Sequence, residues 1–488
     1  MIKCKSTKKI LLTNNLLSII MWLSMKELLA HQKQGINFVV GNNGIGALFW
    51  DTGTAKTRTA LEIFSHYRAQ QPFLKLFVIC PITLIESSWA DDIREFTPFT
   101  YENLRKTQTC KADILLINYE TIITQKFKPV LRAIMSVKPM VVADESHRAK
   151  SYSSKTAKYL HAIGDCTDKK IILTATPAPN SELEYWSQMR FVSKDILGDY
   201  FFKFRHRFFC LMRGKSAIPL AGVDKRMMLK MMQSGYKMQM LPGLEKTFIE
   251  KIKPYCMFVK KRDVLDLPDE VYLYRKIEMT PEQQRCYNEM KNNLVTELKG
   301  EEISVPLALA KLSKLRQITA GFMYGNDKAL HFKFNPKMEE LKNVIEEIGS
   351  HRIIIFCQYK EEIREICKIF DKRAYSLFSE TGSKQEVIDA FRASSNGLLV
   401  THPLTAGVGL SFNNVDYCIF FSLSYSYLEY EQCKGRILRA GKKNRATYIH
   451  LLADNSIDEI IYKAVQKKED NQTLCRRLIN GRRRNVRL

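Results

Sequence analysis

The chain has 488 residues, 45% of them hydrophobic, and its 76 Lys and Arg residues outnumber its 51 Asp and Glu residues, giving a formal net charge of +25. This length exceeds one ordinary core, so the composition predicts a folded protein of two to four domains. The charge favours a polyanionic partner, with nucleic acid as the first candidate, although a lysine-rich coding bias would produce the same excess.

The sequence gives no sign of a membrane span, a zinc site or export. No segment reaches the roughly 18 to 20 consecutive apolar residues that a spanning helix needs. Residues 1–24 have a basic opening and apolar patches, but polar residues interrupt the apolar part and no small-residue cleavage site follows. The twelve cysteines form no Cys-x-x-Cys pair or Cys/His cluster at zinc spacing. We therefore expect no zinc, no membrane partner, and a cytoplasmic protein that is not secreted.

The first predicted strand is the apolar run Ala47–Trp50, which leads through Asp51–Thr57 into a segment with helical apolar spacing. A strand, a tight turn and a helix start carrying Lys-Thr are typical of a phosphate-binding loop. Backbone N–H groups meet the phosphates, Lys56 adds a positive charge, and the Thr57 hydroxyl can bind Mg²⁺. Trp50 and Ala55 stand where the strict pattern has glycine, so an ordinary helix start is the alternative.

Further apolar runs at 76–81, 114–120, 140–143 and 171–173 alternate with helical stretches, which predicts a doubly wound parallel sheet. Ligands bind at the carboxyl ends of the strands in such sheets, where Asp144–His147 and Thr174–Pro177 fall. One carboxylate of Asp144-Glu145 can hold Mg²⁺ while the other activates water. A helix cap beside a solvated acid is the alternative.

Residues 196–262 change in character. Aromatic residues alternate with cations in Phe201–Phe209, and the Met-rich segment Arg226–Met232 follows. Such interleaving can serve nucleic acid, but a small helical core with a charged rim is somewhat more common, so we predict a helical insertion. Thr280-Pro281 then marks a good helix start, and helices are expected to about residue 347.

A second set of apolar strands is predicted at 352–357, 397–401 and 417–421. The segment Gln432–Gly441 follows, and its Arg436 and Arg439 lie on one face of a helix because they are three residues apart. A planar guanidinium suits a transferring phosphoryl group, so both are arginine-finger candidates; a solvated basic helix end is the alternative. Residues 471–488 form a basic tail that can bind phosphate without sequence preference or simply solubilise the chain.

The ordered series of motifs resembles a superfamily-2 helicase-like ATPase of the Swi/Snf type, over roughly residues 25 to 467. Each motif alone is common, but the ordered set is specific. The motifs that carry the resemblance are His31-Gln32, Gly53–Thr57, Cys80-Pro81 with Trp89, Asn118–Glu120, Asp144–His147, Leu173–Pro177, Asp263–Pro268, Met279–Gln283, Leu312–Gln317, Thr405–Leu410 and Gln432–Gly441.

The resemblance implies an α/β fold with two RecA-like doubly wound parallel-sheet lobes, helical insertions, and ATP in the cleft between the lobes. The compact length is similar to that of viral or bacterial members, which implies the cytoplasm of a bacterial cell or of a virus-infected host. The domains expected are an N-terminal extension (1–24), lobe 1 (25–195), the helical insertion (196–262), an inter-lobe bridge with a helical protrusion (263–335), lobe 2 (336–470) and the basic tail (471–488).

The resemblance also assigns roles by motif match, with ATP and Mg²⁺ as cofactors and DNA, most often duplex, as the partner. Gln32 would read adenine, and Lys56 with Glu145 would serve catalysis together with the two arginines. The further residues expected to contact ATP are Gly53, Thr54, Ala55, Thr57 and Gly409; those expected to hold Mg²⁺ are Thr57 and Asp144; and those expected to couple the ATP and DNA sites are His147, Thr174, Thr176 and Gln432.

The resemblance predicts an ATP-dependent DNA translocase or helicase, and two alternatives stay open. One is a helicase that separates DNA or RNA strands. The other is a non-catalytic DNA-binding scaffold whose ATP loop has decayed at Ala55. Three residues depart from the family pattern: Ala55 and Ala175 replace glycines, and Lys442 stands where a glutamine often closes the last motif.

Overall fold

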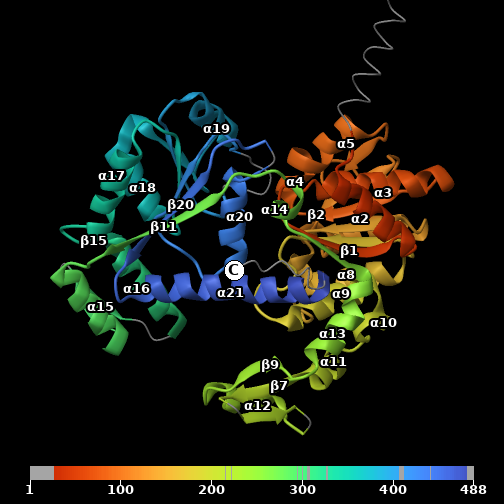
Figure 1. The fold of residues 1–488 in the computed structure, drawn as a ribbon, viewed down its shortest axis with the longest axis horizontal. Helices are drawn as coiled ribbons and strands as arrows, with labels where there is room; N and C mark the ends of the chain where they lie inside the picture. The colour runs from red at the N-terminus through yellow and green to blue at the C-terminus, as the bar shows by residue number, and fades with distance from the viewer. Residues whose placement is uncertain are drawn as a thin grey trace, which may run out of the picture.

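The computed structural model describes residues 27–214, 216–220, 222–293, 295–298, 301–304, 308–325, 328–405, 412–439 and 441–480. Two α/β lobes lie side by side, one formed by the first half of the chain and the other by the second (Figure 1). The predicted extension at residues 1–24 lies outside the described residues. Among the helices that are described, none is both long and apolar enough to cross a membrane.

Lobe 1 is built on a seven-stranded sheet with the order β10-β1-β6-β5-β2-β4-β3, and every neighbouring pair is parallel. Its long strands are continuous apolar runs because both faces of the sheet are covered. The five strands predicted from the sequence are confirmed, and β3 and β10 are added. The strands are β1 (Ile45–Trp50), β2 (Leu76–Cys80), β3 (Tyr101–Asn103), β4 (Ile114–Asn118), β5 (Met140–Asp144), β6 (Lys170–Leu173) and β10 (Cys256–Val259).

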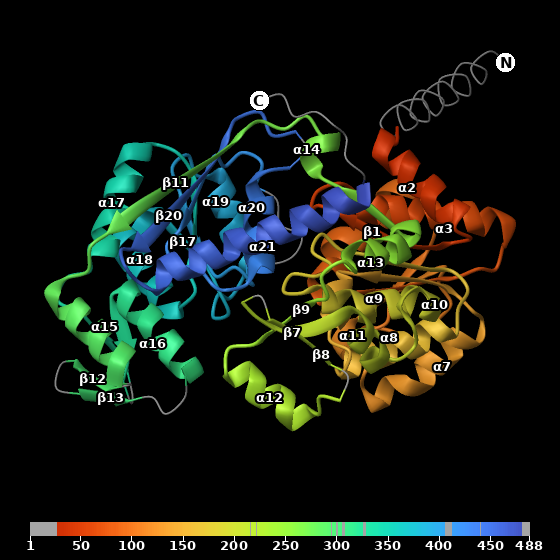
Figure 2. The same cartoon turned by 60° about the horizontal axis from the view of Figure 1, so that its bottom comes forward.

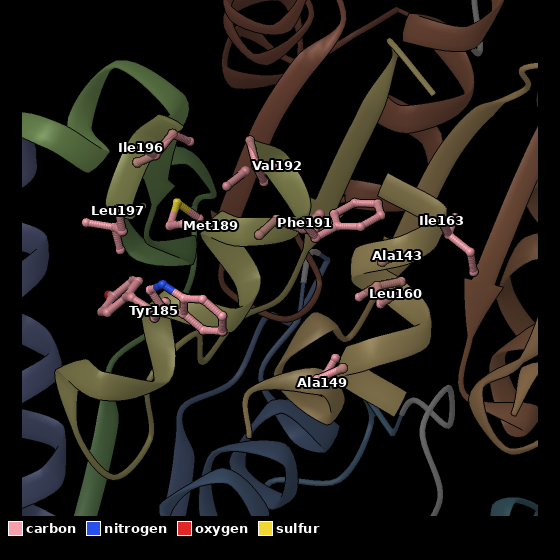
Figure 3. Close-up of a cluster of buried hydrophobic side chains, with 14 of the residues drawn as sticks. Ala143, Ala149, Leu160, Ile163, Tyr185, Met189, Phe191, Val192, Ile196 and Leu197 are labelled. Carbon is pink, nitrogen blue, oxygen red and sulfur yellow. The ribbon is translucent and has the colours of Figure 1, made fainter. Parts of the chain in front are cut away.

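The two faces of this sheet bury two separate hydrophobic clusters. Alternate residues of β1 divide between them: Ala47 and Phe49 point into one, and Leu48 and Trp50 into the other. Side chains from α8 and α9 gather in the first cluster beneath the sheet (Figure 3). The helices of lobe 1 are α2 (Ala30–Gly41), α3 (Lys56–Gln70), α4 (Ile82–Leu84), α5 (Asp91–Phe96), α6 (Tyr119–Ile122), α7 (Lys128–Ser136), α8 (Lys155–Asp165), α9 (Tyr185–Val192) and α10 (Lys194–Leu197), with a π-helical turn at Ile85–Ala90.

The insertion differs from the helical one that the sequence predicted. Besides its helices it contains a three-stranded antiparallel sheet with the order β8-β7-β9, and β10 returns to the sheet of lobe 1. The start of β7 is fully buried against lobe 1, so its run of apolar residues packs as a strand. The elements are α11 (Phe201–Phe208), β7 (Phe209–Arg213), β8 (Ser216–Pro219), α12 (Lys225–Gln233), β9 (Lys237–Met240) and α13 (Glu245–Ile252).

Lobe 2 has a six-stranded parallel sheet with the order β11-β20-β19-β16-β18-β17. The three strands predicted from the sequence form its middle. The strands are β11 (Glu270–Ile277), β16 (Ile353–Phe356), β17 (Ala374–Leu377), β18 (Leu398–Thr401), β19 (Tyr417–Phe420) and β20 (Ala446–Ala453), and the helices packed on them are α17 (Pro336–Ile348), α18 (Lys360–Phe370), α19 (Lys384–Ala393) and α20 (Tyr427–Ile437).

Two segments connect the lobes. The chain crosses through α14 (Lys261–Val264) into β11, and α21 (Ile457–Asn480) runs back across both lobes (Figures 1 and 2). This helix packs on α20 of lobe 2 and α16 (Ala308–Ala320) of the protrusion, and on α13 of the insertion and β10 of the lobe 1 sheet. The predicted basic tail begins inside α21, and its last eight residues lie outside the described part. The protrusion contains α15 (Pro281–Asn293), β12 (Val295–Leu298), β13 (Glu301–Ser304), α16 (Ala308–Ala320), β14 (Phe322–Tyr324) and β15 (Ala329–His331).

Candidate nucleotide site between the lobes

A cavity of about 660 Å³ lies between the two lobes, a volume typical of small-molecule sites. Lobe 1 lines it with the loop after β1, the start of α3 and the carboxylates after β5, and lobe 2 lines it with α20. Motifs from opposite ends of the chain therefore meet. The predicted residues that line the cavity are Gln32, Gly53, Ala55, Lys56, Thr57, Asp144, Glu145, Gln432, Arg436 and Arg439.

The loop after β1 turns sharply through two residues with positive φ. Gly53 has φ +81°, and Ala55, the residue before α3, lies in the left-handed region with φ +58° and ψ +42°. Glycine adopts this conformation freely, whereas a residue with a Cβ is disfavoured there by about 1–2 kcal/mol. The backbone at position 55 therefore favours glycine, and Ala55 holds this conformation under strain.

Lys56 is folded back into its own loop. Its Nζ donates to the carbonyl oxygens of Trp50 (2.9 Å) and Asp51 (3.0 Å), and burial lowers the pKa of Lys56 against the opposing charges of Glu145 and Asp144. Thr54 also supports the loop, because its hydroxyl donates to Asp51 O (2.8 Å) and its own carbonyl lies 2.9 Å from His31 Nε2. The Thr54 side chain is therefore buried within the loop and does not line the cavity.

Asp144 and Glu145 are buried neighbours in different environments. Asp144 accepts hydrogen bonds from Trp89 Nε1 and from the Glu145 amide, both at 2.9 Å, while burial and the charge of Glu145 raise the pKa of Asp144 to about 6. Burial also opposes ionisation of Glu145, but the His147 ring and the Lys56 charge outweigh it and lower the pKa of Glu145 to about 2. These surroundings favour the ionised form of Glu145 more than that of Asp144, and a general base must be ionised.

Three of the predicted coupling residues form one contact chain behind Glu145. His147 Nδ1 lies 3.2 Å from Glu145 Oε2 and 3.0 Å from Thr174 Oγ1, and the Thr176 amide donates to Thr174 Oγ1 (3.2 Å). The loops after β5 and β6 are thereby joined at the proposed base. Gln432, the fourth, lines the cavity from α20 instead.

The sequence did not predict a role for Gln188 of α9, which links the loops after β5 and β6. Gln188 is fully buried; its Oε1 accepts from Ser146 Oγ (2.7 Å), and its Nε2 donates to the carbonyl of Pro177 (2.5 Å). An amide on an otherwise apolar helix face is the only sequence signal that could have found it.

The lobe 2 arginines face the loop at close range. Burial and the neighbouring charge of Arg439 lower the pKa of Arg436 to about 10. The Arg439 Nε donates to Gly435 O (2.9 Å), and its Cγ lies 3.4 Å from the position a Cβ on Gly53 would take. Gly409, the remaining residue predicted to contact ATP, lies outside the described residues.

The cavity is also lined by Gln32, Arg58, Asp92 and Phe96. The Gln32 Oε1 accepts from the Leu29 amide (2.9 Å), which fixes the side chain at the start of α2. The Arg58 guanidinium stacks 4.4 Å over the ring of Phe96, and burial raises the pKa of Asp92 to about 7. Adenine recognition by Gln32 stays a prediction.

Lys442, the last departure from the family pattern, has a structural role. Its buried Nζ donates to the Asp416 carboxylate (2.6 Å) and to the carbonyls of Val415 (2.8 Å) and Asn413 (3.2 Å). Asn413 lines the cavity. Lysine at this position therefore anchors a cavity-lining loop to the segment that carries the arginines.

The residues around the loop suit Mg²⁺ bound together with a nucleotide. In the described part of the chain, no three His, Cys, Asp or Glu side chains gather in a way that could hold a metal alone. Thr57 and Asp144 nevertheless line the same cavity, and Mg²⁺ is commonly held by one or two protein oxygens plus substrate phosphates and water. The donor set therefore fits a metal that arrives with its substrate.

The chain is similar to several known proteins. The chain is 22% identical to protein p41 of Acyrthosiphon pisum secondary endosymbiont phage 1, over 86% of this chain and 91% of p41. It is 22% identical to the ATP-dependent DNA helicase DDM1 of Arabidopsis thaliana, over 91% of this chain and 61% of that protein. It spans between 27% and 42% of the length of four other curated relatives.

Among solved structures, the Sulfolobus solfataricus SWI2/SNF2 ATPase core in complex with dsDNA aligns with a TM-score of 0.40 and 21% identity, covering 93% of this chain and 97% of that chain. The sequence also matches two domain families. Residues 336–441 match the helicase conserved C-terminal domain and residues 31–321 match the SNF2-related domain, so this chain belongs to the SNF2-related family.

Proposed function

We propose that this protein is an ATP-dependent DNA translocase that couples ATP hydrolysis between its lobes to movement along duplex DNA. The observation that carries the proposal is that Lys56 and Glu145 of lobe 1 line one cavity with Arg436 of lobe 2. The printed name of the plant relative, an ATP-dependent DNA helicase, supports it. The net charge of +25 is consistent with a DNA partner.

Phosphoryl transfer depends mainly on positioning and on neutralising charge. Lys56 and the amides of its loop would hold the phosphates, with phosphate oxygens replacing the loop carbonyls that Lys56 now contacts. Glu145 would orient the attacking water and accept its proton. Mg²⁺, when bound through Thr57 and Asp144, would supply further neutralisation of the phosphate charge.

Movement would follow from the division of the site between the lobes. Because Arg436 and Arg439 belong to lobe 2, the site is complete only when the lobes are closed, and hydrolysis removes the γ-phosphate charge that favours closure. The contacts of His147 with Glu145 and Thr174 would report that change to the loop after β6. Alternating grip on the DNA backbone would then advance the protein.

The translocase proposal is tested by displacement of the third strand from a DNA triplex, with Glu145→Gln as the control. We expect wild-type protein to displace the strand only with ATP and the variant to bind ATP without displacing it. Hydrolysis of ATP without displacement would overturn translocation but leave the ATPase proposal standing. Separation of a forked duplex in a parallel assay would instead identify a strand-separating helicase.

One observation favours a second candidate, a DNA-binding scaffold without turnover. Ala55 occupies a left-handed conformation that glycine adopts more easily. A loop that no longer binds ATP would tolerate such a residue. A scaffold would bind duplex DNA equally well with and without nucleotide and would show no ATPase activity. A large gain of turnover in Ala55→Gly would support this candidate over the first.

A further inference from the structure

The point where the chain crosses between the lobes contains a buried ionic cluster, which the function proposed above does not use. The crossing segment is fixed to the phosphate loop. The Lys261 amide at the start of α14 donates to Asp51 Oδ2 (3.2 Å), and the Asp51 amide donates to Val259 O at the end of β10 (3.0 Å). A shift of α14 therefore acts directly on the residue that begins the loop.

Glu270, the first residue of β11, is the carboxylate at the centre of this cluster. Its side chain is 5% exposed and lies 3.8 Å from Lys261 Nζ and 3.2 Å from Arg262 Nη2. It also accepts a hydrogen bond from the hydroxyl of Tyr272, and the cations around it lower the pKa of Glu270 although burial opposes this. Glu270 thus neutralises Lys261 and Arg262, the cations at the lobe 1 end of the crossing segment.

The cluster continues into α20 through Lys434, which is 4% exposed. Its Nζ donates to the Tyr272 hydroxyl (3.2 Å), pairs with Glu431 (2.6 Å) and lies over the rings of Tyr272 and Tyr430. Lys434 stands two residues before Arg436 on α20, and Arg439 follows the end of this helix; both arginines line the cavity. A series of polar contacts therefore connects the loop after β1 in lobe 1, through Glu270, to α20 of lobe 2.

Removing the Glu270 charge would leave Glu431 to neutralise Lys261, Arg262 and Lys434, so like charges would be less well compensated in a region with little water. A buried cation is costly unless an opposite charge accompanies it, so Lys261 and Lys434 would move apart or rearrange. Either movement would change the position of α20 relative to the loop after β1. An error of about 1 Å in the position of a catalytic group can lower a rate about a hundredfold.

We propose that Glu270 is a positioning residue that sets the register of Arg436 and Arg439 against the phosphate loop when the lobes close. The inference rests on the proposed ATPase function. In this proposal the crossing segment contributes to catalysis as well as connecting the lobes.

Steady-state ATP hydrolysis with saturating duplex DNA tests the proposal in Glu270→Gln, Glu270→Asp and Lys434→Met. We expect Glu270→Gln to lower kcat about tenfold and to leave the KM for ATP within about twofold, because the loop still binds phosphates. Glu270→Asp keeps the charge and should recover part of the rate. The double variant Glu270→Gln/Lys434→Met should be no slower than Glu270→Gln alone, since both changes break one network.

Asp458→Asn is the matched control, because it breaks another buried ion pair of lobe 2, that of Asp458 with Lys337, away from the cavity. It should lower the melting temperature and leave kcat at 25 °C within twofold. The inference is overturned if Glu270→Gln keeps the wild-type kcat or if Asp458→Asn lowers kcat by the same factor. It is also overturned if the double variant lowers kcat by the product of the two single reductions. Wild-type protein without ATPase activity would instead overturn the proposed function itself.

Discussion

Gly435 of α20 is packed so closely on Thr52 of the loop after β1 that a Cβ on the glycine would overlap the Thr52 hydroxyl oxygen. A side chain at this position requires either rotation of the Thr52 hydroxyl or a wider separation of the lobes. Lobe 2 therefore contacts the loop after β1 directly, next to Arg436 and Arg439, which follow Gly435 in the chain.

Gly435→Ala should therefore obstruct closure. We expect kcat/KM for ATP to fall at least tenfold, while thermal stability changes little, because alanine favours the helix by about 1 kcal/mol and offsets part of the clash. Gly382→Ala is the control, since a Cβ there meets nothing within 4 Å. Equal activity of both variants would show that the lobes need not approach this closely.

Ala55→Gly should relieve backbone strain in the loop. Left-handed strain of about 1–2 kcal/mol exceeds the entropic cost of glycine, about 0.5–1 kcal/mol, so the melting temperature should rise slightly. In a competent enzyme, turnover should stay within about threefold of wild type. Asn43→Gly, at another position with positive φ (+57°), controls for the backbone effect, and a large rise in turnover confined to Ala55→Gly would contradict competence.

Gln188→Leu should weaken the link between the loops after β5 and β6. It leaves the Ser146 hydroxyl and the Pro177 carbonyl without their amide partner, so we expect the stimulation of ATPase by DNA to fall about tenfold while the basal rate stays within threefold. The ratio of the two rates in one preparation is the measurement. Ser136→Ala, which removes an exposed hydroxyl contact at the end of α7, should leave the ratio unchanged.

His450 should make lobe 2 sensitive to acid. Burial lowers its pKa from 6.5 to about 4, while its ring lies 3.1 Å from both the Tyr430 hydroxyl and the Leu273 carbonyl oxygen. Between these values the unfolded chain binds the extra proton, so the stabilisation is complete above pH 6.5 and declines as pH falls toward 4. The shift corresponds to about 3 kcal/mol as an upper bound.

Urea unfolding between pH 4.5 and 7.5 measures this effect. The free energy of unfolding of His450→Phe should depend less on pH than that of wild type, because phenylalanine keeps the stacking on Phe420 without a titrating group. Identical pH profiles would assign the acid sensitivity to other groups.

The sequence predicted the strands and sites that depend on local pattern. Buried parallel strands such as β2 and β5 are continuous apolar runs, and the polar clusters follow them because ligand sites form at strand ends. The meeting of Lys56 with Arg436 was expected only through the family resemblance, since no local pattern relates residues so far apart. The structure brings both to one cavity.

What the sequence did not predict depends on tertiary contacts. β11 forms the edge of the lobe 2 sheet and contains charged residues and exposed tyrosines, so it lacks the apolar run of a central strand. The buried positions of Gln188 and Glu270 are likewise set by partners from distant segments. At Ala55 the sequence shows that a glycine of the motif is replaced, but only the backbone angle in the structure explains why glycine is favoured there.

We expect the inter-lobe cavity to hydrolyse ATP under the control of nucleic acid. The most direct test is the steady-state ATPase rate of wild type, Lys56→Ala and Glu145→Gln, each measured with duplex, single-stranded, forked and RNA cofactors. Wild type should hydrolyse ATP at a rate that duplex DNA stimulates at least tenfold, and both variants should lose this activity. A wild-type rate of zero with every cofactor, or equal rates in wild type and Glu145→Gln, would contradict it.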